Sequence, residues 1–382
     1  MNETVNILVA PLTWGLGHAT RCIPIIQALQ EDGYRVIIAS DGIALELLQK
    51  EFPQLQTVTL PSYDIEYSKK GQHFKRKMLS NIPKIVKAIR KEHKILQSIL
   101  EDYSIDGVIS DNRLGLYTSK VPTVFITHQL QVLSGKTTSI TTFLHKRFIK
   151  RFDECWVPDY KEEINLSGAL GHPKNIDHIV HYIGPLSRME KENLPSHYDA
   201  LVILSGPEPQ RSILETLLLT ELKKYHGDIL FVRGIIEEEE IRSKQKNIEI
   251  VNFLTSDKLA KAMNSVDFVI ARSGYTTIMD LAALHKKAFF IPTPGQAEQE
   301  YLAKRLKDKG IAPYSKQDDF KVKDLAKLCV YKGFEESQET TELKQFFSLF
   351  KRKRKLRSNT KFAFNIDLLI MRFNDMLDNR KA

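Results

Sequence analysis

Short runs of β-branched and aromatic apolar residues alternate with longer helical patterns along most of the chain. Near-continuous apolar runs are typical of strands that are buried on both faces of a parallel sheet, with helices as the crossover connections. The pattern therefore predicts an α/β architecture of doubly wound parallel sheets. The expected strands are Asn6–Thr13, Arg35–Ser40, Thr57–Leu60, Asp106–Asp111, Thr123–His128 and Cys155–Pro158, then Ala200–Ser205, Asp228–Arg233, Glu249–Leu254, Asp267–Ala271 and Ala288–Pro292.

The strand pattern stops and restarts once, which indicates two domains. Helical patterns such as Ala19–Asp32, Ile43–Phe52 and Lys75–Asp102 connect the strands of the first half. The segment Tyr182–Ser196, with its glycine and prolines, has the composition of a linker. A chain of 382 residues also exceeds the roughly 150 residues of an average domain. We expect one domain over residues 1–185, a second over 186–335, and basic, amphipathic helices over 336–382.

Ligands of doubly wound sheets bind beyond the carboxyl ends of the strands, so we expect the site in the loops after the strands. The first loop contains Gly15, Gly17 and His18 and opens a helix. The glycines allow a tight turn and close approach of a ligand, and exposed N–H groups at a helix start favour an anion. The helix dipole would keep His18 neutral and able to accept a proton, although a helix-capping or buried polar histidine would fit the same pattern.

Two loops of the second half carry polar residues at the same end of a sheet. In the first, a strand ends at Arg272 and a helix starts within Ser273, Gly274, Tyr275 and Thr276. Small residues and free N–H groups there suit a diphosphate, and Asp280, further along the helix, could accept hydrogen bonds from a ribose diol. The second loop, Pro292–Glu300, adds amide and carboxylate groups. For the first of these two loops, a helix capped by Ser273 with Asp280 on its surface is the simpler alternative.

These motifs together resemble the MurG-type glycosyltransferases, whose C-terminal domain defines glycosyltransferase family 28. The similarity is strongest over residues 249–315, in the order NFL, ARSGYTTIMD and PTPGQAEQE. The sequence GLGH matches the N-terminal glycine loop of the family, and YIGPLSR matches its interdomain segment. The resemblance implies a GT-B architecture, in which two Rossmann-like domains face a central cleft and the second holds most of a nucleotide-sugar donor.

The resemblance also assigns positions for the donor and the acceptor. Two of them depart from the family pattern: Asp280 stands where glutamate is usual for the ribose, and Glu300 replaces the second of two sugar-binding amides. The prolines of the second-domain glycine loop, residues 205–211, depart as well. The implied donor-binding residues are Gly15, Gly17, Arg188, Ser205, Gly206, Arg211, Phe253, Leu254, Arg272, Ser273, Gly274, Thr276, Asp280, Gln299 and Glu300, and His128 and Gln129 fall on the acceptor side.

The chemistry expected from these residues is transfer of a hexose such as N-acetylglucosamine from a UDP-sugar to a hydroxyl group of a glycan or lipid-linked acceptor. No Asp-X-Asp pair follows a strand, so we expect no metal and no cofactor, with helix N–H groups and Arg272 stabilising the leaving diphosphate. His18 is the candidate general base, and attack opposite the leaving group would invert the anomeric centre. A UDP-sugar 2-epimerase of the same fold and a non-catalytic nucleotide-sugar-binding subunit remain alternatives.

Charge and composition indicate where such a protein would work. No apolar run reaches the roughly 18 residues of a membrane span, no signal peptide is evident, and Cys22, Cys155 and Cys329 form neither a disulfide nor a zinc pattern, which favours the cytoplasm. The net charge of +9 is concentrated in Lys69–Lys94 and Lys351–Arg357.

These two basic runs are either solvated helix faces or a site for an anionic partner such as the inner face of the cytoplasmic membrane. They lack interleaved stacking aromatics, so we expect no nucleic-acid partner. Residues 362–373 have apolar side chains at helical spacing. They would pack back on the first domain or lie on a membrane surface.

Overall fold

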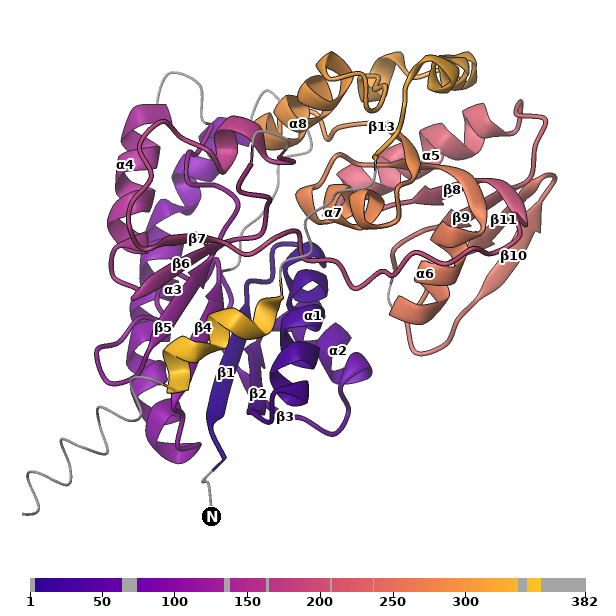
Figure 1. Ribbon diagram of the computed structural model, residues 1–382. Coiled ribbons are helices and arrows are strands. Elements are labelled where there is room, and N and C mark those ends of the chain that lie inside the picture. Colours follow the sequence, from indigo (N-terminus) through magenta and orange to yellow (C-terminus); the bar gives the residue numbers. More distant parts are fainter. Residues whose placement is uncertain are drawn as a thin grey trace, which may run out of the picture.

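The computed structural model describes residues 4–63, 74–133, 138–162, 165–206, 208–235, 237–335 and 342–351, with the backbone only for residues 74–80 and 82. It contains two α/β domains side by side (Figure 1). This arrangement confirms the predicted fold class of two doubly wound, Rossmann-like domains.

The N-terminal domain contains a parallel seven-stranded sheet in the order β3-β2-β1-β4-β5-β6-β7. The strand order reverses at β1: β2 and β3 lie on one side of it, and β4 to β7 lie on the other. Pro11 of β1 lies opposite Asp111 of β4. The carboxyl ends of these two strands therefore form the switch point at which ligands of such sheets bind. The strands are β1 (Asn6–Pro11), β2 (Arg35–Ser40), β3 (Gln56–Thr59), β4 (Gly107–Asp111), β5 (Thr123–Ile126), β6 (Glu154–Val157) and β7 (Val180–Tyr182).

The C-terminal domain contains a six-stranded sheet in the order β10-β11-β9-β8-β12-β13. Its strands are parallel except β10, which pairs antiparallel with β11 at the edge of the sheet. The strands are β8 (Tyr198–Ile203), β9 (Ile229–Val232), β10 (Arg242–Gln245), β11 (Ile248–Val251), β12 (Val266–Ala271) and β13 (Lys287–Phe290).

Helices cover both faces of each sheet. The longer ones are α1 (Gly17–Glu31), α2 (Gly42–Glu51), α3 (Phe74–Asp102) and α4 (Thr138–Ile149) in the first domain, and α5 (Gln210–Leu222), α6 (Ser256–Asn264), α7 (Tyr275–Ala283) and α8 (Ala297–Asp308) in the second. Short 3₁₀ segments are η3 (Gly168–Leu170), η4 (Gln317–Asp319), η5 (Val322–Val330) and η6 (Leu343–Phe347). Within the described residues, no helix is both long and apolar enough to cross a membrane.

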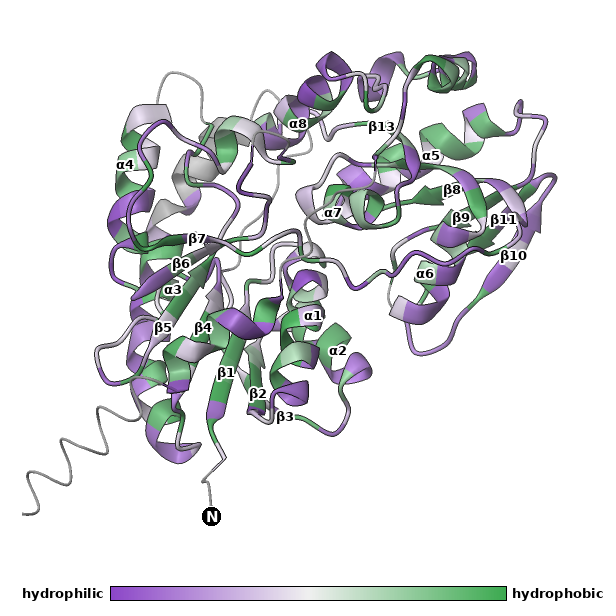
Figure 2. Ribbon diagram, viewed as in Figure 1, coloured by the Kyte–Doolittle hydropathy of each residue, from purple (hydrophilic) through white to green (hydrophobic). Residues whose placement is uncertain are grey.

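The two faces of the first sheet belong to different hydrophobic cores. Ile7 and Val9 pack on the side of α1, whereas Leu8 and Ala10 pack on the other side, with Leu96 of α3. This alternation is the two-residue period of a strand that is buried on both faces. The strands are accordingly among the most hydrophobic segments of the molecule (Figure 2).

Every strand expected from the sequence is present, with ends that agree closely. Three elements were not predicted from the sequence: β7, β10 and α4. The four residues of β10 are polar and exposed, and the three of β7 are half-buried, so neither has the apolar run by which strands were recognised. Helix α4 carries apolar residues on its exposed side, which hides the usual amphipathic pattern.

Residues 342–351 return from the C-terminal domain and lie across the N-terminal one (Figure 1). Phe347 and Phe350 are fully buried there, and the Tyr34 hydroxyl donates to the carbonyl of Phe347 at 3.0 Å. A side chain on Gly107 would collide with Phe350. The basic run Lys351–Arg357, apart from Lys351, and the amphipathic segment 362–373 lie outside the described residues.

Candidate active site

The first glycine loop lies between β1 and α1, at the boundary between the domains. Gly15 has a φ of +82°, a conformation that favours glycine. A Cβ atom on Gly17 would come within 2.9 Å of Thr276 Oγ1 in the second domain. The Thr276 hydroxyl donates to the Gly17 carbonyl at 3.0 Å. Gly15 therefore permits the turn, and Gly17 permits close contact between the loop and the start of α7.

His18, at the start of α1, is held by the carboxylate at the end of β4. Its Nδ1 lies 3.0 Å from Asp111 Oδ1, and its side chain is 14% exposed. Burial lowers the pKa of His18, with Asp111 opposing that shift. Arg21 Nη2 lies 2.9 Å from the same Nδ1, so Nδ1 faces both an acceptor and a donor, and the tautomer depends on which of them it pairs with. With its proton on Nδ1 and directed at Asp111, a neutral His18 ring would carry its lone pair on Nε2, where it could accept a proton.

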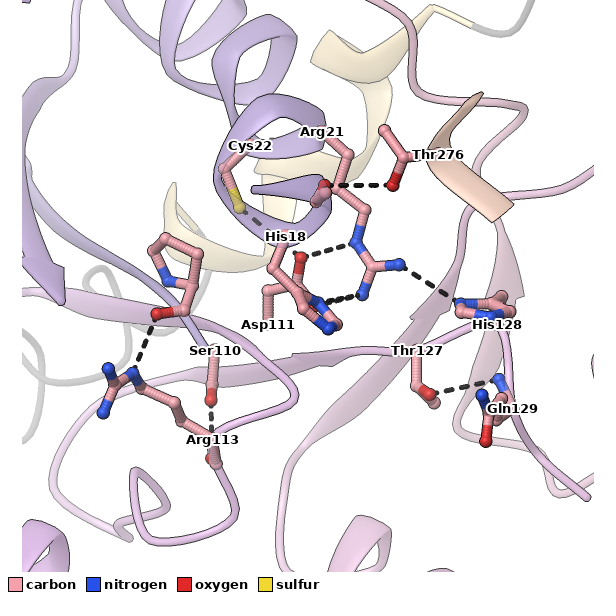
Figure 3. A network of polar contacts seen from close by, with 12 residues as sticks. His18, Arg21, Cys22, Ser110, Asp111, Arg113, Thr127, His128, Gln129 and Thr276 are labelled. Carbon is pink, nitrogen blue, oxygen red and sulfur yellow. Dashed lines mark hydrogen bonds and ion pairs between the residues drawn. The ribbon is translucent and has the colours of Figure 1, made fainter. Parts of the chain in front are cut away.

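Arg21, one helical turn after His18, neutralises Asp111. Its Nε donates to Asp111 Oδ2 at 2.5 Å, and its Nη2 donates to Oδ1. Burial alone would raise the pKa of Asp111, but Arg21 and His18 hold it well below its usual range. Asp111 is therefore ionised although it has no exposed surface. Two partners on one face of α1 fix it in place (Figure 3).

The same network reaches the second domain through His128. Arg21 Nη1 lies 3.2 Å from His128 Nδ1, and His128 Nε2 lies 2.8 Å from Glu298 Oε1 at the start of α8. An arginine that donates to Nδ1 leaves the His128 proton on Nε2, facing the carboxylate. Gln129 also donates to Glu298. Burial opposes ionisation of Glu298, but His128, then His18 and Arg21, lower its pKa.

Tyr275 supports this contact between the domains. Its ring stacks on the His128 ring, with centroids 4.1 Å apart and planes 9° apart, and its hydroxyl donates to the Pro158 carbonyl at 2.8 Å. Tyr275 is the first residue of α7, so the helix start is fixed against β5 and β6 of the other domain. The predicted acceptor-side residues, His128 and Gln129, consequently lie beside the predicted donor helix.

Arg272 does not have the expected role. It is 1% exposed, and Nη1 donates to the carbonyls of Ile291 and Pro292. Nη2 donates to the Gln210 carbonyl and to Gln317 Oε1. Burial lowers its pKa to about 10. The structure corrects the expectation that Arg272 adds charge to a diphosphate, because its guanidinium ties the strand ends together inside the domain.

The remaining part of that motif stands at the start of α7. Gly274 is the residue before the helix and has an extended backbone, and the Ser273 hydroxyl donates to the Gln299 carbonyl at 2.8 Å. Ser273 therefore orders the neighbouring loop. The Thr276 hydroxyl donates to Gly17, so the backbone N–H groups at the helix start remain the feature here that suits an anion.

Asp280 and Arg188 lie together where α7 faces the linker. The Ser187 hydroxyl donates to Asp280 Oδ1 at 2.8 Å, and burial raises the pKa of Asp280 to about 6, with Arg188 opposing. Arg188 Nη1 donates to the Ser256 hydroxyl at 2.6 Å and lies 3.6 Å from Glu51 Oε1. The buried Arg188 Nε has no hydrogen-bond partner among the described residues.

Phe253 and Leu254, which the family resemblance places against the uracil of the donor, follow β11 and are half-buried. Lys50, near the end of α2, approaches the Phe253 ring, with Nζ 5.1 Å from its centroid. Its ammonium also donates to the Glu237 carbonyl at 2.8 Å. The end of α2 thus reaches the strand-end loop to which the family resemblance assigns the base.

The second-domain glycine loop is only partly as expected. Gly206 has a φ of +102°, and Ser205 is half-buried beside it. Arg211, however, is bound by its own domain: Nε donates to Glu208 Oε1 at 2.6 Å and Nη1 to Glu215 Oε2 at 2.5 Å. Two carboxylates of its own domain therefore balance the charge of Arg211, which the resemblance assigned to donor binding.

Gln299 and Glu300, the expected sugar-binding pair, accept hydrogen bonds from the loop before α8. Gln299 Oε1 accepts from the Thr293 N–H at 2.8 Å, and Glu300 Oε1 accepts from the Gly295 N–H at 3.0 Å. Glu298, which the sequence analysis did not assign, is the residue of this loop that reaches His128.

The sequence analysis also missed Asp111, Arg21 and Tyr275. A signal existed for each: Asp111 ends a predicted strand, Arg21 follows His18 by one turn, and Tyr275 opens the predicted donor helix. Strand order, which a single sequence does not reveal, was needed to place Asp111 beside His18. Among the described residues, no group of three or more histidine, cysteine or acidic side chains could hold a metal ion.

The sequence is similar to those of known glycosyltransferases. Residues 208–356 match the glycosyltransferase family 28 C-terminal domain, and residues 5–145 match glycosyl transferase family 1. A Haemophilus ducreyi UDP-N-acetylglucosamine--N-acetylmuramyl-(pentapeptide) pyrophosphoryl-undecaprenol N-acetylglucosamine transferase is 25% identical over 82% of this chain and 85% of its own. An uncharacterized glycosyltransferase of Methanosarcina acetivorans is 24% identical, over 78% and 82%.

Solved structures share the fold. Acinetobacter baumannii MurG superposes with a TM-score of 0.56 and 15% identity, over 92% of this chain and all of its own. The kitacinnamycin glycotransferase gives 0.58 and 15%, over 86% and 90%. The chain resembles the MurG-type glycosyltransferases: it has the GT-B fold, its second domain matches the family 28 C-terminal domain, and it is a glycosyltransferase that takes its sugar from a nucleotide-sugar donor.

Proposed function

We propose that this enzyme transfers N-acetylglucosamine, or a closely related hexose, from a UDP-linked donor to an acceptor hydroxyl, with inversion and without a metal ion. The observation that carries the proposal is the position of His18. It is oriented by Asp111 in one domain, and the loop that carries it bonds Thr276 at the start of α7 in the other. A proton acceptor therefore lies next to the helix start to which the family resemblance assigns the donor diphosphate.

In the proposed reaction His18 is the general base. Its Nε2 takes the proton of the acceptor hydroxyl while that oxygen attacks the anomeric carbon of the donor. Asp111 keeps the Nδ1–H tautomer and stabilises the imidazolium that forms, the role of the carboxylate in a hydrolase triad. The lowered pKa of His18 supports the role, because a neutral imidazole must be present at the start of each turnover.

The bond from the anomeric carbon to the diphosphate oxygen breaks with its electron pair, so negative charge grows on the leaving UDP. Backbone N–H groups at the start of α7 would stabilise that charge. Arg272 and Arg211 are committed within the domain, so Arg188 is the better candidate among the predicted arginines. A single displacement on the face opposite the leaving group inverts the anomeric centre.

The acceptor we propose is a hydroxyl of a lipid-linked glycan, and the enzyme would act at the inner face of the cytoplasmic membrane. The support is the Haemophilus ducreyi relative, whose name specifies a pyrophosphoryl-undecaprenol acceptor. Much of the basic segments Lys69–Lys94 and Lys351–Arg357 lies outside the described residues. We propose no nucleic-acid partner.

A nucleotide panel tests the donor assignment. The melting temperature of the protein is measured with UDP, dTDP, GDP and ADP, in buffer with and without EDTA. We expect selective stabilisation by UDP that EDTA leaves unchanged. Stabilisation by another nucleotide alone would contradict the UDP assignment. Incubation with UDP-N-acetylglucosamine and no acceptor is the companion measurement, because epimerised donor would identify a 2-epimerase instead of a transferase.

A further inference from the structure

Trp14 is the exposed residue of the glycine loop that carries His18. It is 38% exposed, whereas Thr13 and residues 15–18 are half-buried. Among the described residues, no hydrogen-bond acceptor pairs with its indole N–H and no aromatic ring stacks on it. A large indole gains most from burial and from a partner for its N–H group. The Trp14 ring is therefore available to a ligand.

The loop places Trp14 at the switch point of the N-terminal sheet. It follows β1, whose carboxyl end lies beside that of β4, and Trp14 precedes His18 by four residues. The Trp14 N–H donates to the Leu12 carbonyl at 3.1 Å. Apart from its chain neighbours, no atom of the described residues lies within 4 Å of a Cβ atom built on Gly15. The turn between Trp14 and His18 thus leaves room for a ligand.

A buried ion network fixes the start of this loop. The Thr13 hydroxyl lies 2.7 Å from both the carbonyl oxygen and Oδ1 of Asp41, and Oδ1 also accepts from Arg113 Nη2. Arg113 Nε donates to the Pro11 carbonyl at 2.8 Å, and Arg113 has no exposed surface. One guanidinium therefore holds the loop at two points, directly at Pro11 and through Asp41 at Thr13.

The same guanidinium is anchored to α3 and to the loop after β3. Arg113 Nη1 lies 2.6 Å from Glu92 Oε1 and donates to the Pro61 carbonyl at 3.2 Å. The buried Glu92 also accepts from the Tyr63 hydroxyl at 2.7 Å. Figure 3 shows Arg113 apart from the His18 network, with its guanidinium turned toward a carbonyl at the end of β1. Burying charges costs free energy, and one use that offsets the cost is to fix a single conformation.

We propose that Trp14 is the surface on which a sugar ring of the acceptor stacks, and that Arg113 and Asp41 are positioning residues for it. One face of a pyranose carries C–H groups and packs on an indole ring, while its hydroxyl groups stay at the edge. A ring stacked on Trp14 presents these hydroxyls beside the loop that carries His18. The inference rests on the proposed function and deepens it, because it names the chemical group that the acceptor presents.

The composition of the loop favours a sugar over a hydrocarbon chain. Polar side chains, those of Thr13 and His18, stand at both ends of the loop, and its two glycines contribute no side chain. Leu16, the other apolar residue, is half-buried. A prenyl chain would require a continuous apolar surface. A sugar ring requires one aromatic face with polar groups around it, which is the arrangement at Trp14.

Tryptophan fluorescence tests the proposal on the full chain, which has two tryptophans. Trp156 has no exposed surface, so acrylamide should quench mainly Trp14. Quenching is measured with and without UDP, in the presence of the methyl glycosides of glucose, galactose, mannose or N-acetylglucosamine. We expect at least one glycoside to lower the quenching constant about twofold, because a stacked ring covers one face of the indole. Glycerol at equal viscosity and farnesyl phosphate are the comparisons.

Substitutions of the two tryptophans assign the signal. Trp14→Phe should show weak quenching that no glycoside changes, whereas Trp156→Phe should keep the full response. Calorimetry then uses the glycoside that shields Trp14 most. Trp14→Ala should bind it about tenfold more weakly, and Trp14→Tyr, which keeps an aromatic face, about threefold more weakly. The UDP affinity of each variant should match that of the wild type.

Thr13→Val tests the positioning network without leaving a buried charge unpaired. It keeps the shape of the side chain and removes the hydroxyl that joins the loop to Asp41. Affinity for the same glycoside should fall about threefold, as expected for one lost hydrogen bond. Thr216→Val, which removes an exposed hydroxyl bonded to the Ser212 carbonyl, should leave the affinity unchanged. Equal affinities of the two variants would show that the network does not position Trp14. Circular dichroism checks that every variant is folded.

The outcomes separate this role of Trp14 from the proposed function. If UDP raises the melting temperature but no glycoside changes the quenching, the role of Trp14 is assigned wrongly and the donor assignment stands. If only farnesyl phosphate shields Trp14, the residue contacts a hydrocarbon chain and the proposal is overturned. Loss of UDP affinity in Trp14→Ala would place the residue in the donor site, with the same consequence. If a glycoside shields Trp14 and UDP does not bind, the proposal stands and the donor assignment fails.

Discussion

The two halves of the active site use charge in different ways. In the N-terminal half, buried charges pair directly: Asp111 lies between His18 and Arg21, and the network continues to Glu298. In the C-terminal half, Arg272 and Arg211 are bound within the domain, and Asp280 has a pKa of about 6.

The difference suggests that proton transfer depends on a few fixed charges. Donor binding depends instead on backbone groups and on side chains such as Asp280, which changes its ionisation near pH 6. Substitutions in the first half should affect the chemical step and stability, and substitutions in the second half should affect affinity.

Replacing His18 by alanine should give the largest effect. Loss of the general base is expected to lower the rate of single-turnover sugar transfer by about 10²–10⁴-fold. UDP affinity should remain close to that of the wild type, because His18 belongs to the N-terminal half. Rapid-quench measurement with saturating enzyme gives the rate, and calorimetry gives the affinity. Near-normal transfer would remove His18 from the mechanism, and a large loss of UDP affinity would contradict the division between the two halves.

Asp111→Asn should affect stability as well as activity. It leaves the buried Arg21 without its carboxylate, and breaking a buried ion pair on one side destabilises proteins by about 3–5 kcal/mol. Urea unfolding measures the loss. The control is Asp308→Asn, which breaks the exposed pair with Lys304 and should leave the free energy of unfolding almost unchanged. Equal effects of the two substitutions would show that burial of the Asp111 network has no energetic importance.

Asp280→Asn should change the pH dependence of donor binding. The carboxyl group is neutral below pH 6 and ionised above it, and the ionised form is the stronger acceptor for ribose hydroxyls. UDP affinity of the wild type should therefore rise as the pH increases through about 6, and the variant should lack this rise and bind about tenfold more weakly at pH 8. Calorimetry between pH 5 and pH 8 measures both.

The stability of the wild type should follow the opposite trend. The folded pKa of Asp280 lies above the ordinary value of 3.8 for an aspartate, so its contribution to stability is full below about pH 4 and is lost as the pH rises through about 6. Asp280→Asn should remove that part of the pH dependence. If the variant retains both pH profiles, Asp280 neither titrates near pH 6 nor contacts the donor.

The fold could be read from the sequence because buried parallel strands leave near-continuous apolar runs. The site was predictable only in part. His18 was found because a histidine after a glycine-rich turn is unusual, whereas the role of Asp111 depends on β4 lying next to β1. The family resemblance assigned Arg272 to the diphosphate of the donor. The position of a residue in the sequence does not show whether its side chain points toward a ligand or into its own domain.

The smallest expected effect concerns the contact that joins the two halves at the end of α2. Glu51 Oε1 accepts from the Ser256 hydroxyl and lies 3.6 Å from Arg188 Nη1, so it partly neutralises the arginine we propose for the diphosphate. Glu51→Gln keeps a hydrogen-bond acceptor and removes the charge. UDP should therefore bind about twofold to fivefold more tightly, as expected for an ion pair of about 0.5–1 kcal/mol.

Glu46→Gln provides the comparison, because it makes the same change of charge at an exposed position of the same helix and should leave the affinity unchanged. If both variants gain equally, a general change of net charge explains the effect. If Glu51→Gln weakens UDP binding, Glu51 contacts the donor itself. The donor site would then include a carboxylate from α2 of the N-terminal domain. Proton transfer and donor binding would no longer be divided between the two domains.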